Sequence, residues 1–160
     1  MTAGIGRKTR QLLLWLPAVL LAGCGSSLVW TGNYSFPGNT WHPEHTVTFV
    51  PDTISLEKND DNPLTGVLSI RYAAKMPMEM LPLVMEIESP QDGLYRCDTI
   101  QQRLLPMDER TAGKGTLGVF ESCDTILLHS RPVPGWSVSF YPASEEDISG
   151  IFSITFELLK

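Results

Sequence analysis

The chain has 160 residues, of which 42% are hydrophobic and 19% charged, and its formal net charge is −6 at pH 7. This length allows one domain with a real hydrophobic core. An acidic chain repels phosphate backbones and anionic headgroups, so composition argues against nucleic acid as a partner and against purely electrostatic binding to a membrane.

The first residues have the order of a bacterial export signal. Three basic residues within positions 7–10 precede an apolar stretch over 12–21, which is too short for a stable bilayer span of about 20 residues. The stretch runs into Leu21-Ala22-Gly23-Cys24, which resembles the lipobox of bacterial lipoproteins. We therefore predict a signal peptide over 1–23 and lipid modification of Cys24. The alternative, a buried helix with an incidental cysteine, does not account for the basic, apolar, small order.

Cleavage before Cys24 would leave 137 residues with a net charge of −9, because the three basic residues are lost with the leader. We predict that residues 24–33 comprise the acylated cysteine and a tether, and that 34–160 form one domain. Several acyl chains on one cysteine would give lasting attachment. Gly25-Ser26-Ser27 lacks both an inner-membrane retention aspartate and the acidic run of surface export. This favours an outer-membrane anchor facing the periplasm.

Strict alternation of apolar and polar residues dominates the predicted domain, whereas no window keeps apolar residues at helical spacing for three turns. The clearest run is the last, in which Phe152, Ile154, Phe156 and Leu158 are expected to face inward. We predict an all-β fold, an antiparallel β-sandwich of about seven to eight strands. The predicted strands are 46–49, 66–72, 81–87, 98–104, 117–120, 125–129, 136–141 and 152–158.

Two prolines, Pro77 and Pro82, flank the start of one predicted strand. Proline cannot donate to a strand ladder, so this segment is expected to be a loop or the entry to an edge strand.

Two cysteines remain in the predicted mature chain, Cys97 and Cys123, and each begins the tetrapeptide Cys-Asp-Thr-Ile. In an exported protein an even count suggests a disulfide. The sequence cannot show whether the two Cα atoms come within about 7 Å, so the alternative of two separate apolar residues stays open.

Three tryptophans, Trp30, Trp41 and Trp136, are candidates for an aromatic contact surface, since aromatic faces suit the stacking of sugar rings. The alternative, which we prefer for the aromatic cluster near the mature N-terminus, is that its members pack the first strand onto the sandwich.

Catalytic and metal-binding patterns are weak. His42 and His45 are three residues apart, which places them on opposite faces of a strand, and Pro43 disfavours a helix. Glu86 and Glu88 share one strand face, as glycosidase carboxylates can, but alternate with apolar residues like the solvent face of a strand. We therefore predict no enzyme, no catalytic residue, no metal site and no cofactor.

The order of several short motifs over the mature region resembles the gliding-motility lipoprotein GldH family of Bacteroidota. The motifs follow the lipobox cysteine in chain order. They are Tyr34, Trp41 before Val47-Thr48-Phe49, Ile70-Arg71-Tyr72, Pro77 before Leu81-Pro82-Leu83, Asp98-Thr99, Gly115-Thr116-Leu117-Gly118, and Ile148-Ser149-Gly150-Ile151 through Lys160.

The resemblance implies a non-catalytic accessory or structural lipoprotein of the gliding machinery or of the associated secretion apparatus, with other envelope proteins as partners. It carries over no catalytic residue set. The alternative hypothesis is a glycan-binding or nutrient-uptake envelope lipoprotein that uses the tryptophans named above.

Overall fold

The computed structural model describes residues 28–51, 64–91, 93–105, 118–128 and 134–160. The predicted signal peptide, Cys24 and residues 25–27 lie outside these ranges. The elements are β1 Leu28–Ser35, the 3-10 helix η1 Pro37–Asn39, β2 Thr40–Trp41, β3 Val47–Phe49, β4 Thr65–Ala73, β5 Met80–Ser89, β6 Leu94–Arg103, β7 Val119–Leu127, β8 Ser137–Pro142, β9 Ile148–Ser149 and β10 Ile151–Leu159.

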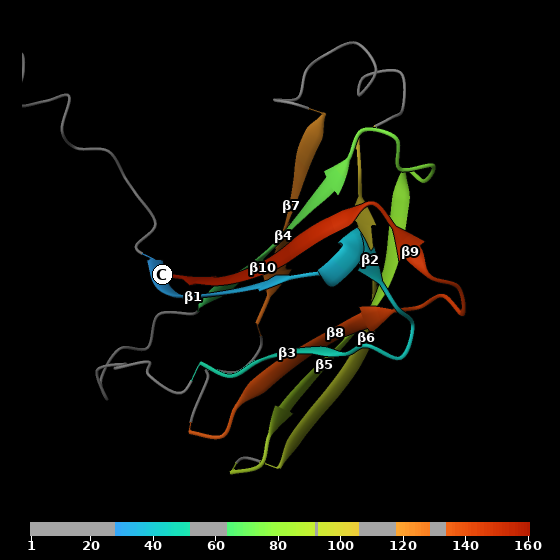
Figure 1. Ribbon diagram of the computed structural model, residues 1–160. Helices are drawn as coiled ribbons and strands as arrows, with labels where there is room; N and C mark the ends of the chain where they lie inside the picture. The colour runs from blue at the N-terminus through green and yellow to red at the C-terminus, as the bar shows by residue number, and fades with distance from the viewer. Residues whose placement is uncertain (1–27, 52–63, 92, 106–117, 129–133) are drawn as a thin grey trace, which may run out of the picture.

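The strands form two four-stranded antiparallel sheets that pack face to face (Figure 1). The first sheet, sheet A, has the order β1-β10-β4-β7, and the second, sheet C, has the order β3-β8-β5-β6; β2 and β9 form a short ribbon at one end. The predicted all-β sandwich is therefore confirmed. Within the described residues, no helix is long and apolar enough to cross a membrane.

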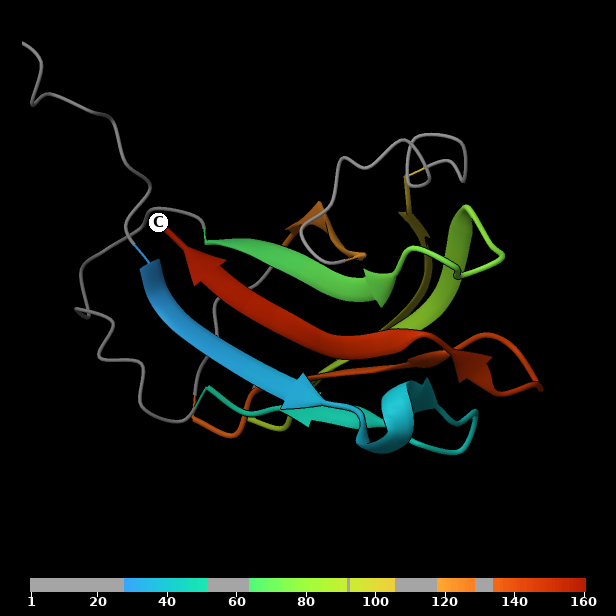
Figure 2. The same cartoon turned by 45° about the horizontal axis from the view of Figure 1, so that its top comes forward.

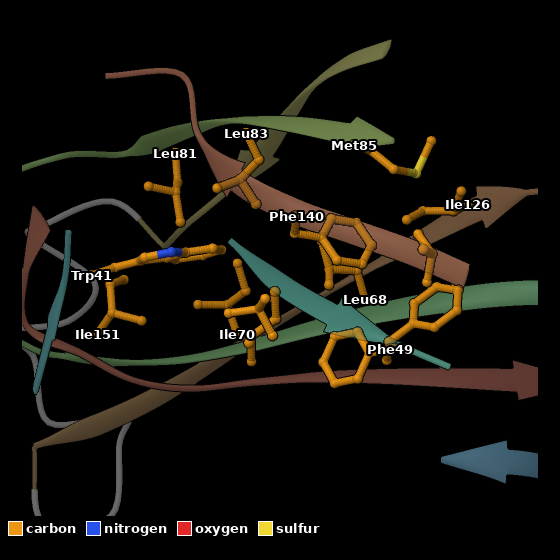
Figure 3. Close-up of a cluster of buried hydrophobic side chains, with 14 of the residues drawn as sticks. Trp41, Phe49, Leu68, Ile70, Leu81, Leu83, Met85, Ile126, Phe140 and Ile151 are labelled. Atoms are coloured by element: carbon orange, nitrogen blue, oxygen red, sulfur yellow. The ribbon is translucent and has the colours of Figure 1, made fainter. Parts of the chain in front are cut away.

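The core lies between the two sheets because the apolar positions of their strands alternate inward (Figure 3). On β4 the inward residues Leu68, Ile70 and Tyr72 are completely buried, as the alternation predicts. Three phenylalanines from three strands fill the centre. The ring centroids of Phe49 and Phe140 are 6.2 Å apart, and both rings lie about 6 Å from Phe156.

The first strand corrects the predicted domain boundary. Residues 28–33, assigned from sequence to the tether, belong to β1, which pairs with β10 from Leu28↔Leu159 to Ser35↔Ser153. Figure 2 shows the start of β1 beside the end of β10. The alternation of β1 is masked by Gly32 and by a register shift between Leu28 and Trp30, which explains why the strand escaped prediction.

Two other strand predictions need correction. The predicted strands 117–120 and 125–129 are joined in one continuous strand, β7, which runs only from Val119 to Leu127; Leu117 and His129 lie outside the described residues. In β10, a register shift between Ile151 and Ser153 makes Ile151 the buried residue, and Phe152 is only partly buried. The inward orientation expected for Phe152 is therefore wrong.

Pro82 lies in β5, an inner strand of sheet C and not the predicted edge strand. Its carbonyl accepts a hydrogen bond from the Ala143 backbone N–H at 3.0 Å, immediately after β8 ends at Pro142. In an antiparallel ladder the N and O of one residue point to the same neighbour. The missing N–H of Pro82 therefore faces Ala143, just beyond the end of β8, so only the reciprocal bond at the end of this ladder is absent.

Side-chain hydrogen bonds join the two sheets along one side of the sandwich, between β6 and β7. The Gln102 side-chain amide on β6 donates to Ser122 Oγ on β7 at 2.8 Å, and Ser122 Oγ donates to the Arg103 carbonyl. Near the other end of the same strands, Arg96 Nη1 donates to the Leu127 carbonyl at 3.3 Å. These bonds link the edge strands of the two sheets and show that β6 and β7 run antiparallel.

Candidate functional site

Two of the three tryptophans proposed as an aromatic contact surface are core residues. Trp41 is 0% exposed; its Nε1 donates to the His45 carbonyl at 2.8 Å and its ring lies 4.7 Å from that of Phe36. In Figure 3 the Trp41 ring lies between Leu81 and Ile151. Trp136 is 1% exposed. The prediction of a contact surface is wrong for both residues, because neither ring face can reach a ligand.

Trp30, the third candidate, is half-buried. Its ring meets Phe49 edge-on at 6.1 Å and covers Gly32, where a Cβ atom would clash with the indole. Gly32 thus leaves room for a tryptophan that closes the side of the sandwich between β1 and β3. Trp30 therefore acts in packing, which is the alternative preferred from sequence.

Cys97 and Cys123 are free, exposed thiols on strands of different sheets. Since Arg103 on β6 lies against Ser122 on β7, the Cys123 backbone lies near Gln102, about five residues from Cys97, and the Cys123 thiol points away, 3.2 Å from Ser69 Oγ on β4. Five residues of strand span roughly 16 Å, far beyond the Cα separation that a disulfide allows. The structure contradicts the disulfide that the sequence left open.

The histidines lie in separate environments. His42 Nδ1 is 2.8 Å from Asp147 Oδ1, and this hydrogen bond, aided by the carboxylate charge, raises the pKa of His42 above its usual 6.5. The His45 ring packs 5.1 Å from that of Tyr34. Among the described residues, no group of three or more His, Cys, Asp or Glu could hold a metal ion.

The outer face of sheet C carries a polar cluster that the sequence did not predict. Glu86 Oε1 on β5 accepts hydrogen bonds from the hydroxyls of Tyr95 on β6, at 3.1 Å, and Tyr141 on β8, at 3.0 Å. Cys97 Sγ lies 4.0 Å from the same oxygen. We call Glu86, Tyr95, Tyr141 and Cys97 the Glu86 cluster.

Strand register explains how the cluster forms. Glu86 pairs directly with Ser139 on β8 and with Cys97 on β6, so their side chains share one row of the sheet surface. The two tyrosines lie two residues away from those partners on the same face, and long side chains reach across this diagonal. Alternation could place each residue on the outer face, but only the pairing of β5 with β6 and β8 brings them together.

The Glu86 carboxylate raises the pKa of both tyrosines, to about 12 for Tyr95, chiefly because each hydroxyl donates a hydrogen bond to it. Both phenols are therefore neutral donors near pH 7 and cannot serve as phenolate nucleophiles. Glycosidase chemistry with two carboxyl groups would need a second acidic residue on the other side of the substrate from Glu86. Glu88, two residues along the same strand, is exposed and is paired with Ser137 and Tyr95 in the ladder. The cluster is thus suited to hydrogen bonding at a surface.

No family model and no curated protein matches this chain.

Proposed function

We propose that this protein is an envelope lipoprotein, anchored by acyl chains on Cys24, whose β-sandwich acts through non-catalytic contacts with other envelope proteins. The observation that carries the proposal is the leader itself, a basic start followed by a short apolar stretch and Leu21-Ala22-Gly23-Cys24. The fold supports it, because the first strand of the domain begins at Leu28, four residues after that cysteine.

The specific version of the proposal is a role in gliding motility or in the associated secretion apparatus, as the order of motifs resembling the GldH family implies. An anchor in the outer membrane, facing the periplasm, agrees with the residues that follow Cys24. The ordered outer faces of both sheets would then be available to neighbouring envelope proteins.

A direct test compares the natural chain with a Cys24→Ser variant in the native host. Growth with an alkyne-tagged fatty acid should label the natural protein, and the label should be absent from the variant. The natural protein should also sediment with membranes that the variant leaves. Labelling of both proteins, or of neither, would refute acylation at this cysteine. In a gliding host, normal spreading and cargo secretion by the variant would refute the motility role.

A second candidate function is glycan binding on the outer face of sheet C. The tryptophans are packing residues, so the stacking surface proposed from sequence must move to the Glu86 cluster, where Tyr95 is 60% exposed. A sugar ring stacked on Tyr95 could donate hydrogen bonds from its hydroxyl groups to the Glu86 carboxylate. A glycan panel with Tyr95→Ala as the matched variant tests this candidate. Binding that survives the substitution would refute this site.

A further inference from the structure

Four of the five exposed large apolar side chains among the described residues lie at one end of the sandwich, where β1 begins, β3 ends, β6 begins and β7 ends. We call these residues the apolar rim: Leu28, Val50, Tyr95 and Leu127, which are 55%, 47%, 60% and 70% exposed. The fifth, Met80, is 45% exposed and lies at the opposite end of β5.

Register places the two leucines of the rim in the last row of sheet A. Leu28 pairs with Leu159, Leu159 with Thr65, and Thr65 with Leu127, so one row crosses all four strands. Three strand spacings place the two edge leucines roughly 14 Å apart. The row carries three leucines, one of them partly buried, at the edge of an acidic domain.

The ends of the two sheets coincide there. Trp30 near the start of β1 meets Phe49 at the end of β3, with ring centroids 6.1 Å apart. Arg96 near the start of β6 bonds to the Leu127 carbonyl at the end of β7. Val50, which directly follows β3, and Tyr95 on β6 therefore border the same end of the sandwich as Leu28 and Leu127.

The short connection to Cys24 identifies what this end faces. Only three residues separate Cys24 from Leu28. Four Cα–Cα steps reach at most about 14 Å when fully extended. If Cys24 carries acyl chains in a bilayer, Leu28 must lie within that distance of the headgroups, and the rest of the rim lies at the same end.

We propose that the apolar rim rests on the bilayer that holds the Cys24 acyl chains, so that the sandwich stands end-on with its strands directed away from the membrane. This inference rests on the proposed acylation. The leucines would enter the boundary between headgroups and acyl chains. The Tyr95 ring, whose hydroxyl bonds to Glu86, would lie at the level of the headgroups. Lys160 and Glu88 lie at the same end. They have opposite charges, and Arg96 at this end is paired with Asp98, so the charges offset one another and the contact is chiefly apolar.

The test uses the full acylated protein in vesicles of phosphatidylethanolamine and phosphatidylglycerol, in a background with Cys97→Ser and Cys123→Ser. A fluorophore is attached through Thr125→Cys, near the rim, or through Met80→Cys, at the far end. Strands of this length separate the two sites by roughly 30 Å. Nitroxide-labelled lipid should quench the fluorophore at position 125 and leave the one at position 80 unquenched.

A second comparison tests the leucines themselves. Leu28→Ser with Leu127→Ser should reduce quenching at position 125. From the transfer free energy of a largely exposed leucine, each substitution should lower the ratio of rim-down to other orientations roughly tenfold. Met80→Ser is the matched control and should change nothing. Thermal unfolding should be unaltered in the double leucine variant and in Met80→Ser, because the side chains are exposed.

The outcomes separate the two proposals. The orientation alone would be overturned by either of two results in a protein that carries lipid on Cys24. One is equal quenching at both positions, and the other is quenching that is insensitive to the leucine substitutions. A chain that carries no lipid on Cys24 and washes off the vesicles would overturn the lipoprotein proposal and this inference with it.

Discussion

Replacing Trp41 with alanine gives the sharpest test of its assignment to the core. The side chain is 0% exposed, packs 4.7 Å from the Phe36 ring and donates to the His45 carbonyl. Truncating a buried tryptophan costs about 3–5 kcal/mol through lost contacts and a cavity. Losing the hydrogen bond to the part-buried His45 carbonyl adds about 0.5–1.5 kcal/mol. A domain stable by about 5–15 kcal/mol would then be close to unfolding.

Urea unfolding followed by circular dichroism measures the effect. Trp41→Phe keeps most of the ring contacts and loses the hydrogen bond, so we expect a smaller loss of about 1–3 kcal/mol. Leu127→Ala, at a residue that is 70% exposed, is the control and should change the free energy of unfolding by less than about 0.5 kcal/mol.

Trp136 provides an internal comparison. It is 1% exposed, and its Nε1 has no hydrogen-bond partner among the described residues. Trp136→Phe removes a donor that is already unpaired, so it should cost less than Trp41→Phe.

If Trp41→Ala lowered the free energy of unfolding by less than about 1 kcal/mol, the core assignment of Trp41 and the reasoning from its burial would be refuted.

Three further predictions follow from local contacts. Gly32→Ala should lower the urea midpoint, because the added Cβ collides with the aromatic rings above it. Asp147→Asn should lower the pKa of His42, which NMR titration measures. In the natural protein, the His42–Asp147 pair stabilises the fold fully below about pH 6.5. This contribution is lost as the pH rises through the raised pKa of His42. Glu86→Gln should lower the pKa of Tyr95 from about 12, seen as earlier tyrosinate absorbance. In the natural protein, stability should fall between about pH 10 and 12, because tyrosine ionises first in the unfolded chain.

Local alternation was enough to predict the fold class and most inner-face residues. In β4 and β5 every second side chain is apolar, and Leu68, Ile70, Leu81 and Leu83 are all fully buried as expected. The inward face of such a strand can be identified from its sequence, because burial of one face requires apolar residues at every second position. The all-β sandwich followed from several such strands without any knowledge of their pairing.

The errors occurred where backbone irregularity or a distant partner decides the structure. The register shift between Ile151 and Ser153 reverses which residue is buried, and no sequence pattern marks it. Trp41 precedes a polar loop, so its burial depends on the core residues that surround it rather than on its own neighbours. The Glu86 cluster likewise exists only because β5 lies between β6 and β8. Pairing between distant strands is a non-local property that periodicity does not encode.

The proposed end-on orientation would constrain where partners can bind. Glu86 is three residues from the rim end of β5, which corresponds to roughly 10 Å along the strand. If the rim rests on the bilayer, the Glu86 cluster lies close above the headgroups, whereas the β2–β9 ribbon near the other end of the sandwich lies furthest from them. A partner that binds the Glu86 cluster must then approach along the membrane surface, so it should itself be membrane-associated. A soluble envelope partner would be expected to bind the far end, near His42 and Asp147.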